Sequence, residues 1–227
     1  MGLFTLLRGS AKPTRPAPSP TSPHSPTARS SPTPTSTAVD GGYLQDLSLA
    51  KLTGAWVLDP THSTVGFAAR HALVTRVRGT FSEFSGIFHL DPEHLDECSA
   101  EVIVQMASVD TRVAQRDEHL RSADFFDTER YPEMVFRSTA VRQREAERYR
   151  MTGDLTIRGH SHPVDIDLVY SGSVVDSFGV ERIGLDGIAY VNRGDWGLTW
   201  NANLETGGML VSEKIKLEFD ISAIRVA

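Results

Sequence analysis

The side chains most suited to chemistry lie together in one segment, residues 116–127, which contains two Arg, three Asp, one Glu and one His. Arg116, Asp117 and His119 could bind the polar headgroup of a ligand, with the carboxylate of Asp117 orienting the guanidinium of Arg116. The same residues could instead form a local network of salt bridges and helix caps that fixes a loop. The sequence leaves both hypotheses open.

Apolar side chains accompany this polar segment. Phe125 and Phe126 lie near its end and could form a lip through which a lipid tail enters, or they could plug the end of a strand. His71 continues an apolar face that includes Phe67. Its imidazole could therefore lie at one end of a cavity, or it could be a structural histidine.

Histidines also raise the alternative of a small metal-dependent enzyme, because imidazole nitrogen is a common zinc ligand. The candidate ligands are His62, His71, His119, His160 and His162. They lack the dense spacing that such sites normally show. His160 and His162 lie between Gly159 and Pro163, a context that predicts solvated turn residues rather than half of a metal site.

Other enzyme classes lack their signatures in this chain. There is no Gly-x-Ser-x-Gly elbow, phosphate-binding loop or His-Glu-x-x-His motif. The single cysteine, Cys98, excludes an intrachain disulfide and favours the reducing cytoplasm. We therefore expect neither enzymatic activity nor a cofactor.

The N-terminal part of the chain differs sharply in composition from the rest. Of the 27 residues in 11–37, 20 are Pro, Ser or Thr and none is Val, Ile, Leu or aromatic. Such a segment has no apolar surface to bury, so residues 1–40 are predicted to be a disordered tail. Residues 41–227 then form one domain. The apolar run near the N-terminus is too short for a secretory signal or a membrane span.

Charge divides in the same way as composition. Residues 41–227 hold 19 of the 23 Lys and Arg but 28 of the 29 Asp and Glu, which is a net charge of about −9. An acidic domain argues against nucleic acid as a partner and against docking on an anionic membrane. We also expect no stable membrane insertion.

Apolar and polar residues alternate with a period of two through most of the domain. This pattern is typical of antiparallel strands with one solvated face. The alternation and shorter apolar runs predict about nine strands, at 55–58, 64–71, 79–90, 101–106, 134–137, 150–158, 164–168, 183–191 and 214–221.

So many amphipathic strands must close on themselves to avoid exposed edges, which predicts an all-β barrel or sandwich. Helix signals are few. Residues 43–51 could form one or two turns, and Asp110-Thr111 could cap a helix over 112–121. This second helix would belong to an excursion between two strands, well placed to cover a barrel opening.

Several short motifs, occurring in order along the domain, resemble the YceI-like family of polyisoprenoid-binding, lipocalin-like proteins. They are Trp56–Asp59 with His62-Ser63, Phe67 and His71; Gly79–Phe81 with Phe84–Gly86; Arg116–Leu120 with Asp124–Phe126; Tyr131-Pro132; Gly153–Gly159; and Arg193–Leu198. The resemblance covers about residues 54 to 222. One departure is His160-Ser161-His162, where the family usually has a small or apolar residue and then a Lys.

This resemblance implies an eight-stranded antiparallel barrel that holds a long isoprenoid or other lipid chain, for transport, storage or sequestration. A homodimer would be consistent with the family. An eight-stranded barrel has room for packed side chains or for one slender ligand, so a fully packed structural or regulatory module is the other alternative. The predicted cavity lining is Phe67, Phe81, Phe84, Val102, Val104, Met106, Phe136, Leu155, Ile157, Ile166 and Leu168. The predicted headgroup and entrance residues are His71, Arg116, Asp117, His119, Phe125 and Phe126.

Overall fold

The computed structural model describes residues 49–72, 74–203 and 210–226. Its sheet contains eleven strand segments in which every pairing is antiparallel. They are β1 (Gly54–Leu58), β2 (Thr64–His71), β3 (Thr75–Phe81), β4 (Phe84–Leu90), β5 (Ser99–Gln105), β6 (Val109–Asp110), β7 (Glu133–Glu145), β8 (Arg148–Ile157), β9 (His160–Val175), β10 (Glu181–Asn192) and β11 (Lys214–Arg225).

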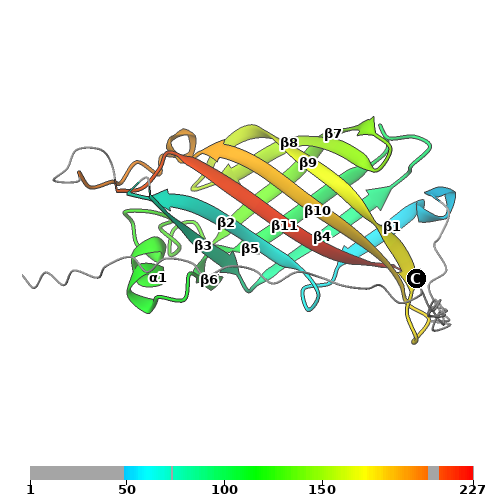
Figure 1. Ribbon diagram of the computed structural model, residues 1–227, viewed down its shortest axis with the longest axis horizontal. Helices are drawn as coiled ribbons and strands as arrows, with labels where there is room; N and C mark the ends of the chain where they lie inside the picture. The colour runs from blue at the N-terminus through cyan, green and yellow to red at the C-terminus, as the bar shows by residue number, and fades with distance from the viewer. Residues whose placement is uncertain (1–48, 73, 204–209, 227) are drawn as a thin grey trace, which may run out of the picture. The chain divides into compact units, whose positions relative to one another are not determined.

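These segments form a closed barrel of eight strands, because three of the strands are interrupted. β1 and β2 lie in succession along β11; β4 pairs with β1, and β3 pairs with β2. β5 pairs with β4, and β6 pairs with β3. From β5 the order around the barrel then continues through β7, β8, β9, β10 and β11, each paired with the strand before it. The β1–β11 pairing closes the ring (Figure 1). The predicted eight-stranded antiparallel barrel is thereby confirmed.

The alternation in the sequence places apolar side chains inside the barrel. In β8, Met151, Leu155 and Ile157 are buried, whereas Asp154 between them is exposed. The predicted strand 79–90 is divided in two, since β3 ends at Phe81 and β4 begins at Phe84.

Side chains close the β1 end of the barrel. The indole of Trp56 is fully buried, and its Nε1 donates to the carbonyl oxygen of Leu52 at 2.9 Å. Leu52 belongs to η1 (Leu49–Leu52), a short 3-10 helix. The guanidinium of Arg225 lies 4.5 Å from the ring centroid of Trp56 and donates to the carbonyl oxygen of Thr53 at 2.9 Å.

At the opposite end, the chain leaves the barrel wall after β6 and returns at β7. This excursion contains α1 (Ala114–Arg121), drawn in green in Figure 1. The predicted cap at Asp110-Thr111 is wrong, because the helix begins after Val113 and has no side-chain cap. Arg112 adopts a positive φ of 65°, which interrupts the helical backbone directly after Thr111.

The turn between β8 and β9 also differs from the prediction. It consists of Arg158 and Gly159 alone, with φ values of 51° and 74°, the combination typical of a tight two-residue hairpin. β9 therefore begins at His160, and the prediction that His160 and His162 belong to a turn is wrong. The ring of His162 lies edge-on to Trp196, with centroids 5.2 Å apart.

Two predictions fall wholly or partly outside the described residues: the tail at 1–40, and positions 43–48 of the predicted helix 43–51. In the described part of the chain, no helix is both long enough and apolar enough to cross a membrane.

Candidate functional site

Two neighbouring cavities lie in the barrel. The larger, which we call the outer cavity, has a volume of about 270 Å³ and lies at the α1 end. The smaller, the inner cavity, has a volume of about 100 Å³. Phe81, Met134 and Leu217 line both cavities. These three side chains therefore separate two parts of one interior space.

The described residues that line the inner cavity are all apolar. They are Val65, Gly66, Phe81, Phe88, Leu90, Ala100, Val102, Val104, Met134, Phe136, Met151, Leu155, Val164, Ile166, Leu168, Leu185, Leu217, Phe219 and Ile221. No polar side chain among them could bind a headgroup, so the space suits only an apolar group.

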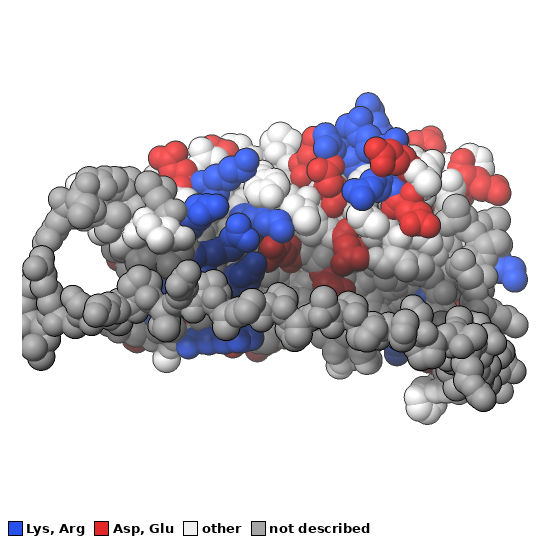
Figure 2. All heavy atoms as spheres, in the orientation of Figure 1, with Lys and Arg blue, Asp and Glu red and all other residues white. Residues whose placement is uncertain are grey.

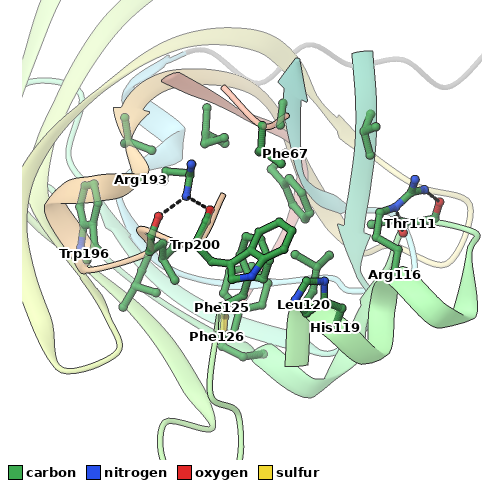
Figure 3. Close-up of a pocket in the computed structure, with 18 of the residues that line it drawn as sticks. Phe67, Thr111, Arg116, His119, Leu120, Phe125, Phe126, Arg193, Trp196 and Trp200 are labelled. Carbon is green, nitrogen blue, oxygen red and sulfur yellow. Dashed lines mark hydrogen bonds between the residues drawn. The ribbon is translucent and has the colours of Figure 1, made fainter. Parts of the chain in front are cut away.

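The outer cavity is also largely apolar but contains polar groups, as Figure 3 shows. Its apolar wall consists of Phe67, Ala69, Val77, Phe81, Met106, Leu120, Phe125, Phe126, Met134, Ile157, Val191, Trp196, Leu198, Trp200, Leu210, Val211, Ile215 and Leu217. The polar lining residues are Arg70, His71, Thr111, Arg116, His119 and Arg193. Arg70 and His71 are exposed, so this cavity reaches the protein surface.

Most residues predicted for the cavity wall do line one of these spaces. The exception is Phe84, which packs against the core but lines neither cavity. It precedes Ser85 in β4, close to the division between β3 and β4. That the lining side chains contact a ligand stays a prediction.

The residues predicted for the headgroup and the entrance also line the outer cavity, except Asp117. Asp117 is buried and lines neither cavity. Its Oδ1 accepts hydrogen bonds from the amide of Thr111 at 2.8 Å and from the Thr111 hydroxyl at 2.5 Å. The prediction that the carboxylate of Asp117 directly orients Arg116 is therefore wrong, because that carboxylate bonds to Thr111 instead.

Arg116 is held by Thr111 rather than by a carboxylate. Its Nε donates to the Thr111 hydroxyl and its Nη2 to the Thr111 carbonyl oxygen, both at 2.8 Å (Figure 3). Asp117 and Arg116 thus both bond to Thr111, and together they attach α1 to the end of β6. This is the local network that the sequence offered as the alternative to headgroup binding, although Arg116 also lines the outer cavity.

Aromatic rings meet at the outer cavity. His119 lies edge-on to Phe125, with centroids 5.1 Å apart, and edge-on to Trp200, at 4.6 Å. Phe125 and Trp200 are themselves 5.2 Å apart. His119 Nε2 is 3.0 Å from Asp124 Oδ2, so the imidazole is oriented by a carboxylate as well as by its aromatic neighbours.

Arg193 fixes the connection between β10 and β11, where Trp200 lies. It begins η3 (Arg193–Trp196) and is 6% exposed. Its Nη1 donates to the carbonyl oxygens of Leu198 and Trp200, the latter at 2.9 Å, and its Nε donates to the carbonyl oxygen of Ser212 at 3.0 Å (Figure 3). Burial lowers the pKa of Arg193 from its ordinary value. No carboxylate among the described residues forms an ion pair with it.

The connection between β10 and β11 supplies cavity residues that the sequence did not assign. Trp196, Leu198 and Trp200 line the outer cavity, and Trp196 Nε1 donates to the carbonyl oxygen of Leu155 at 2.9 Å. One sequence feature could have identified this segment: it has two tryptophans four positions apart and no strand alternation.

The histidines considered as metal ligands do not come together. Within the described ranges, no group of three or more His, Cys, Asp or Glu side chains is arranged to hold a metal ion. His62 instead lies 2.8 Å from Asp59 Oδ2, and His119 bonds to Asp124.

Comparison with known proteins supports one family. A family model described as the YceI-like domain matches residues 56–223. A UPF0312 protein from Photorhabdus laumondii is 38% identical over 135 residues, which make up 60% of this chain and 70% of that protein.

Solved structures share the barrel. BcnA from Burkholderia cenocepacia matches with a TM-score of 0.65 at 22% identity, covering 73% of this chain and 98% of BcnA. A polyisoprenoid binding domain from Saccharophagus degradans, implicated in plant cell wall breakdown, matches with a TM-score of 0.58 at 17% identity, covering 75% and 98% of the two chains. At these identities the likeness establishes the fold alone.

Proposed function

This chain belongs to the YceI-like family, and we propose that it binds one long apolar chain, an isoprenoid or similar lipid, inside its barrel and leaves that ligand chemically unchanged. The observation that supports this proposal is the pair of adjoining cavities, since the described residues that line the inner one are all apolar. An apolar tail would occupy the inner cavity, and a more polar end would remain near Arg116, His119 and Arg193 in the outer cavity.

The energetics suit a slender apolar ligand. Each CH₂ group removed from water contributes about 0.8 kcal/mol, so a few isoprene units in the cavities would offset the entropic cost of association. The Saccharophagus degradans domain is named as polyisoprenoid binding, and this name supports the ligand class. We propose a carrier, storage or sequestering role for the complex.

Native mass spectrometry of the gently purified full chain tests the proposal, combined with solvent extraction of the bound material. We expect an adduct whose extract contains an isoprenoid or fatty chain. Stoichiometric metal in elemental analysis, without a lipid adduct, would instead support the metal-dependent enzyme. Absence of both would support a packed module.

Matched variants locate the ligand. Val104, 2% exposed, lines the inner cavity, whereas Val57, 38% exposed, lies on the outside of β1. We expect Val104→Asp to abolish co-purified lipid and Val57→Asp to retain it. If Val104→Asp fails to fold, Phe67→Arg tests the outer cavity. Unchanged lipid content in a folded Val104→Asp or Phe67→Arg variant would contradict the proposed location.

A further inference from the structure

Basic side chains gather on the outside of the barrel beside the outer cavity. The group consists of Arg70 on β2, Arg76 and Arg78 on β3, and Lys214 and Lys216 on β11, and we call it the basic patch. Figure 2 shows blue atoms gathered over these strands towards the α1 end. The domain as a whole is acidic, so this concentration of positive charge is a local exception.

The patch keeps its positive charge because few carboxylates lie within it. Arg70 is directly opposite Arg76 in the β2–β3 pairing, and neither forms an ion pair with a described carboxylate. Like charges directly opposite one another destabilise a sheet. The arrangement therefore does not serve the stability of the barrel.

Glu218 is the main carboxylate inside the patch. Its Oε1 lies 2.7 Å from Lys216 Nζ, and its Oε2 lies 3.7 Å from Arg78 Nε. The bond to Lys216, and the charges of Lys216, Arg78 and Arg76, lower the pKa of Glu218, although burial acts in the opposite direction. β11 and the residue before it carry two further carboxylates, Glu213 and Asp220, so five cations stand against three carboxylates.

Exposed apolar side chains border the patch. Val74, 80% exposed, lies on the turn between β2 and β3, and Tyr190, 58% exposed, lies on β10. Lys214 Nζ is 4.5 Å from the ring centroid of Tyr190. Cations combined with exposed apolar and aromatic side chains are typical of surfaces that bind at the interface of an anionic bilayer.

The same hairpin forms part of the cavity wall. Ala69, Arg70, His71 and Val77 all line the outer cavity, so the basic patch adjoins the opening of that cavity. We propose that the basic patch docks the barrel on an anionic phospholipid surface, with Val74 entering the headgroup layer, so that the ligand can pass between bilayer and cavity. This inference rests on the proposed lipid-binding function. It also revises the expectation, drawn from the net charge of the domain, that the protein does not dock on an anionic membrane. Docking depends on how charge is distributed locally over the surface.

Vesicle flotation of the full chain tests this docking. We expect the protein to float with vesicles of phosphatidylcholine mixed with phosphatidylglycerol but not with vesicles of phosphatidylcholine alone. High salt should weaken the interaction, because exposed charges are screened. Arg70→Glu combined with Arg76→Glu should reduce binding on the order of tenfold or more, since each basic residue near an anionic surface contributes about a factor of five.

A charge-matched control is Arg142→Glu combined with Arg144→Glu, two exposed positions near the β7–β8 turn. This control should float like the unmodified protein. Equal binding by both double variants, or by both vesicle types, would overturn the proposal. Preferential retention on single-stranded DNA would also overturn it, in favour of a nucleic-acid site. Lipid content measured in the same preparations tests the proposed function separately, because the barrel can hold a ligand inside it whether or not its surface binds vesicles.

Discussion

The imidazole of His119 stands edge-on to the indole of Trp200, with ring centroids 4.6 Å apart and an interplanar angle of 87°. His119 lies on α1, and Trp200 lies on the connection between β10 and β11. The two residues thus join separate parts of the chain across the wall of the outer cavity. Rings in this geometry gain energy beyond that of surface burial alone.

Replacing Trp200 should open the outer cavity. We expect Trp200→Ala to accelerate the transfer of bound lipid to acceptor vesicles, because the ring contacts to both His119 and Phe125 are lost. The variant should still fold, since Trp200 is half-buried. Transfer followed by fluorescence with a labelled isoprenoid measures the rate. Trp200→Phe is the control and should retain most of the slow transfer; equal rates for Trp200→Ala and the parent chain would contradict the role.

Phe81 should limit how deeply a ligand enters. Its ring lines both cavities and lies 5.8 Å from Phe67 and 6.2 Å from Phe126, centroid to centroid. We expect Phe81→Ala to join the cavities and shift the extracted lipid towards longer chains, as measured by mass spectrometry. Loss of this buried ring should cost about 3–5 kcal/mol in urea unfolding. Phe84→Ala, outside both cavities, should leave chain length unchanged.

Asp117 should matter for the stability of the excursion rather than for direct ligand contact. Asp117→Ala leaves the amide and hydroxyl of Thr111 without their acceptor, which should cost about 1–3 kcal/mol. Hydrogen exchange should show increased opening of α1 before the barrel strands open. Asp117→Asn retains an acceptor oxygen and should cost less. Equal effects of the two substitutions would show that the hydrogen bonds to Thr111 are not responsible.

Asp59 should contribute to acid sensitivity. The hydrogen bond from Thr61 is the largest cause of its lowered pKa, and Arg182 and His62 act in the same direction against burial. Because the folded-state pKa lies below the unfolded value of about 3.9, this stabilisation is present above that pH and is lost as the pH falls towards the folded-state pKa.

Urea unfolding over a range of pH tests this role. Asp59→Asn should lower the free energy of unfolding at neutral pH and make its decline in acid shallower. Asp220→Asn, at an exposed position of β11, is the control and should behave like the parent chain. A parallel pH dependence for Asp59→Asn and the parent would contradict the contribution of Asp59.

The sequence predicted most of the cavity wall because the direction of a strand side chain is a local property. Val102 and Val104 alternate with their neighbours in β5, and both line the inner cavity. Phe84 shows where this reasoning fails. The apolar positions are odd up to Phe81 and even from Phe84 onward, where the strand is interrupted. Phe84 pairs with Val104 and packs against the core, but at the start of β4 it lines neither cavity.

The polar segment at 116–127 shows a different limit. Its residue types predicted either a headgroup site or a structural network, and composition alone could not separate these roles. The contacts of Asp117 with Thr111 depend on the positive φ of Arg112, which directs the chain away from a regular helix. No periodic pattern in the sequence encodes that backbone conformation.

By itself, the sequence determined the antiparallel strands and the inward face of each, because the alternation of side chains has a period of two in any strand. Only the tertiary structure decided that the interior is divided at Phe81 and that Trp196 and Trp200 complete its outer part. Trp196, for example, bonds to Leu155, which is 41 positions earlier. Such contacts depend on closure of the barrel, which brings distant connections together in a way that no local pattern specifies.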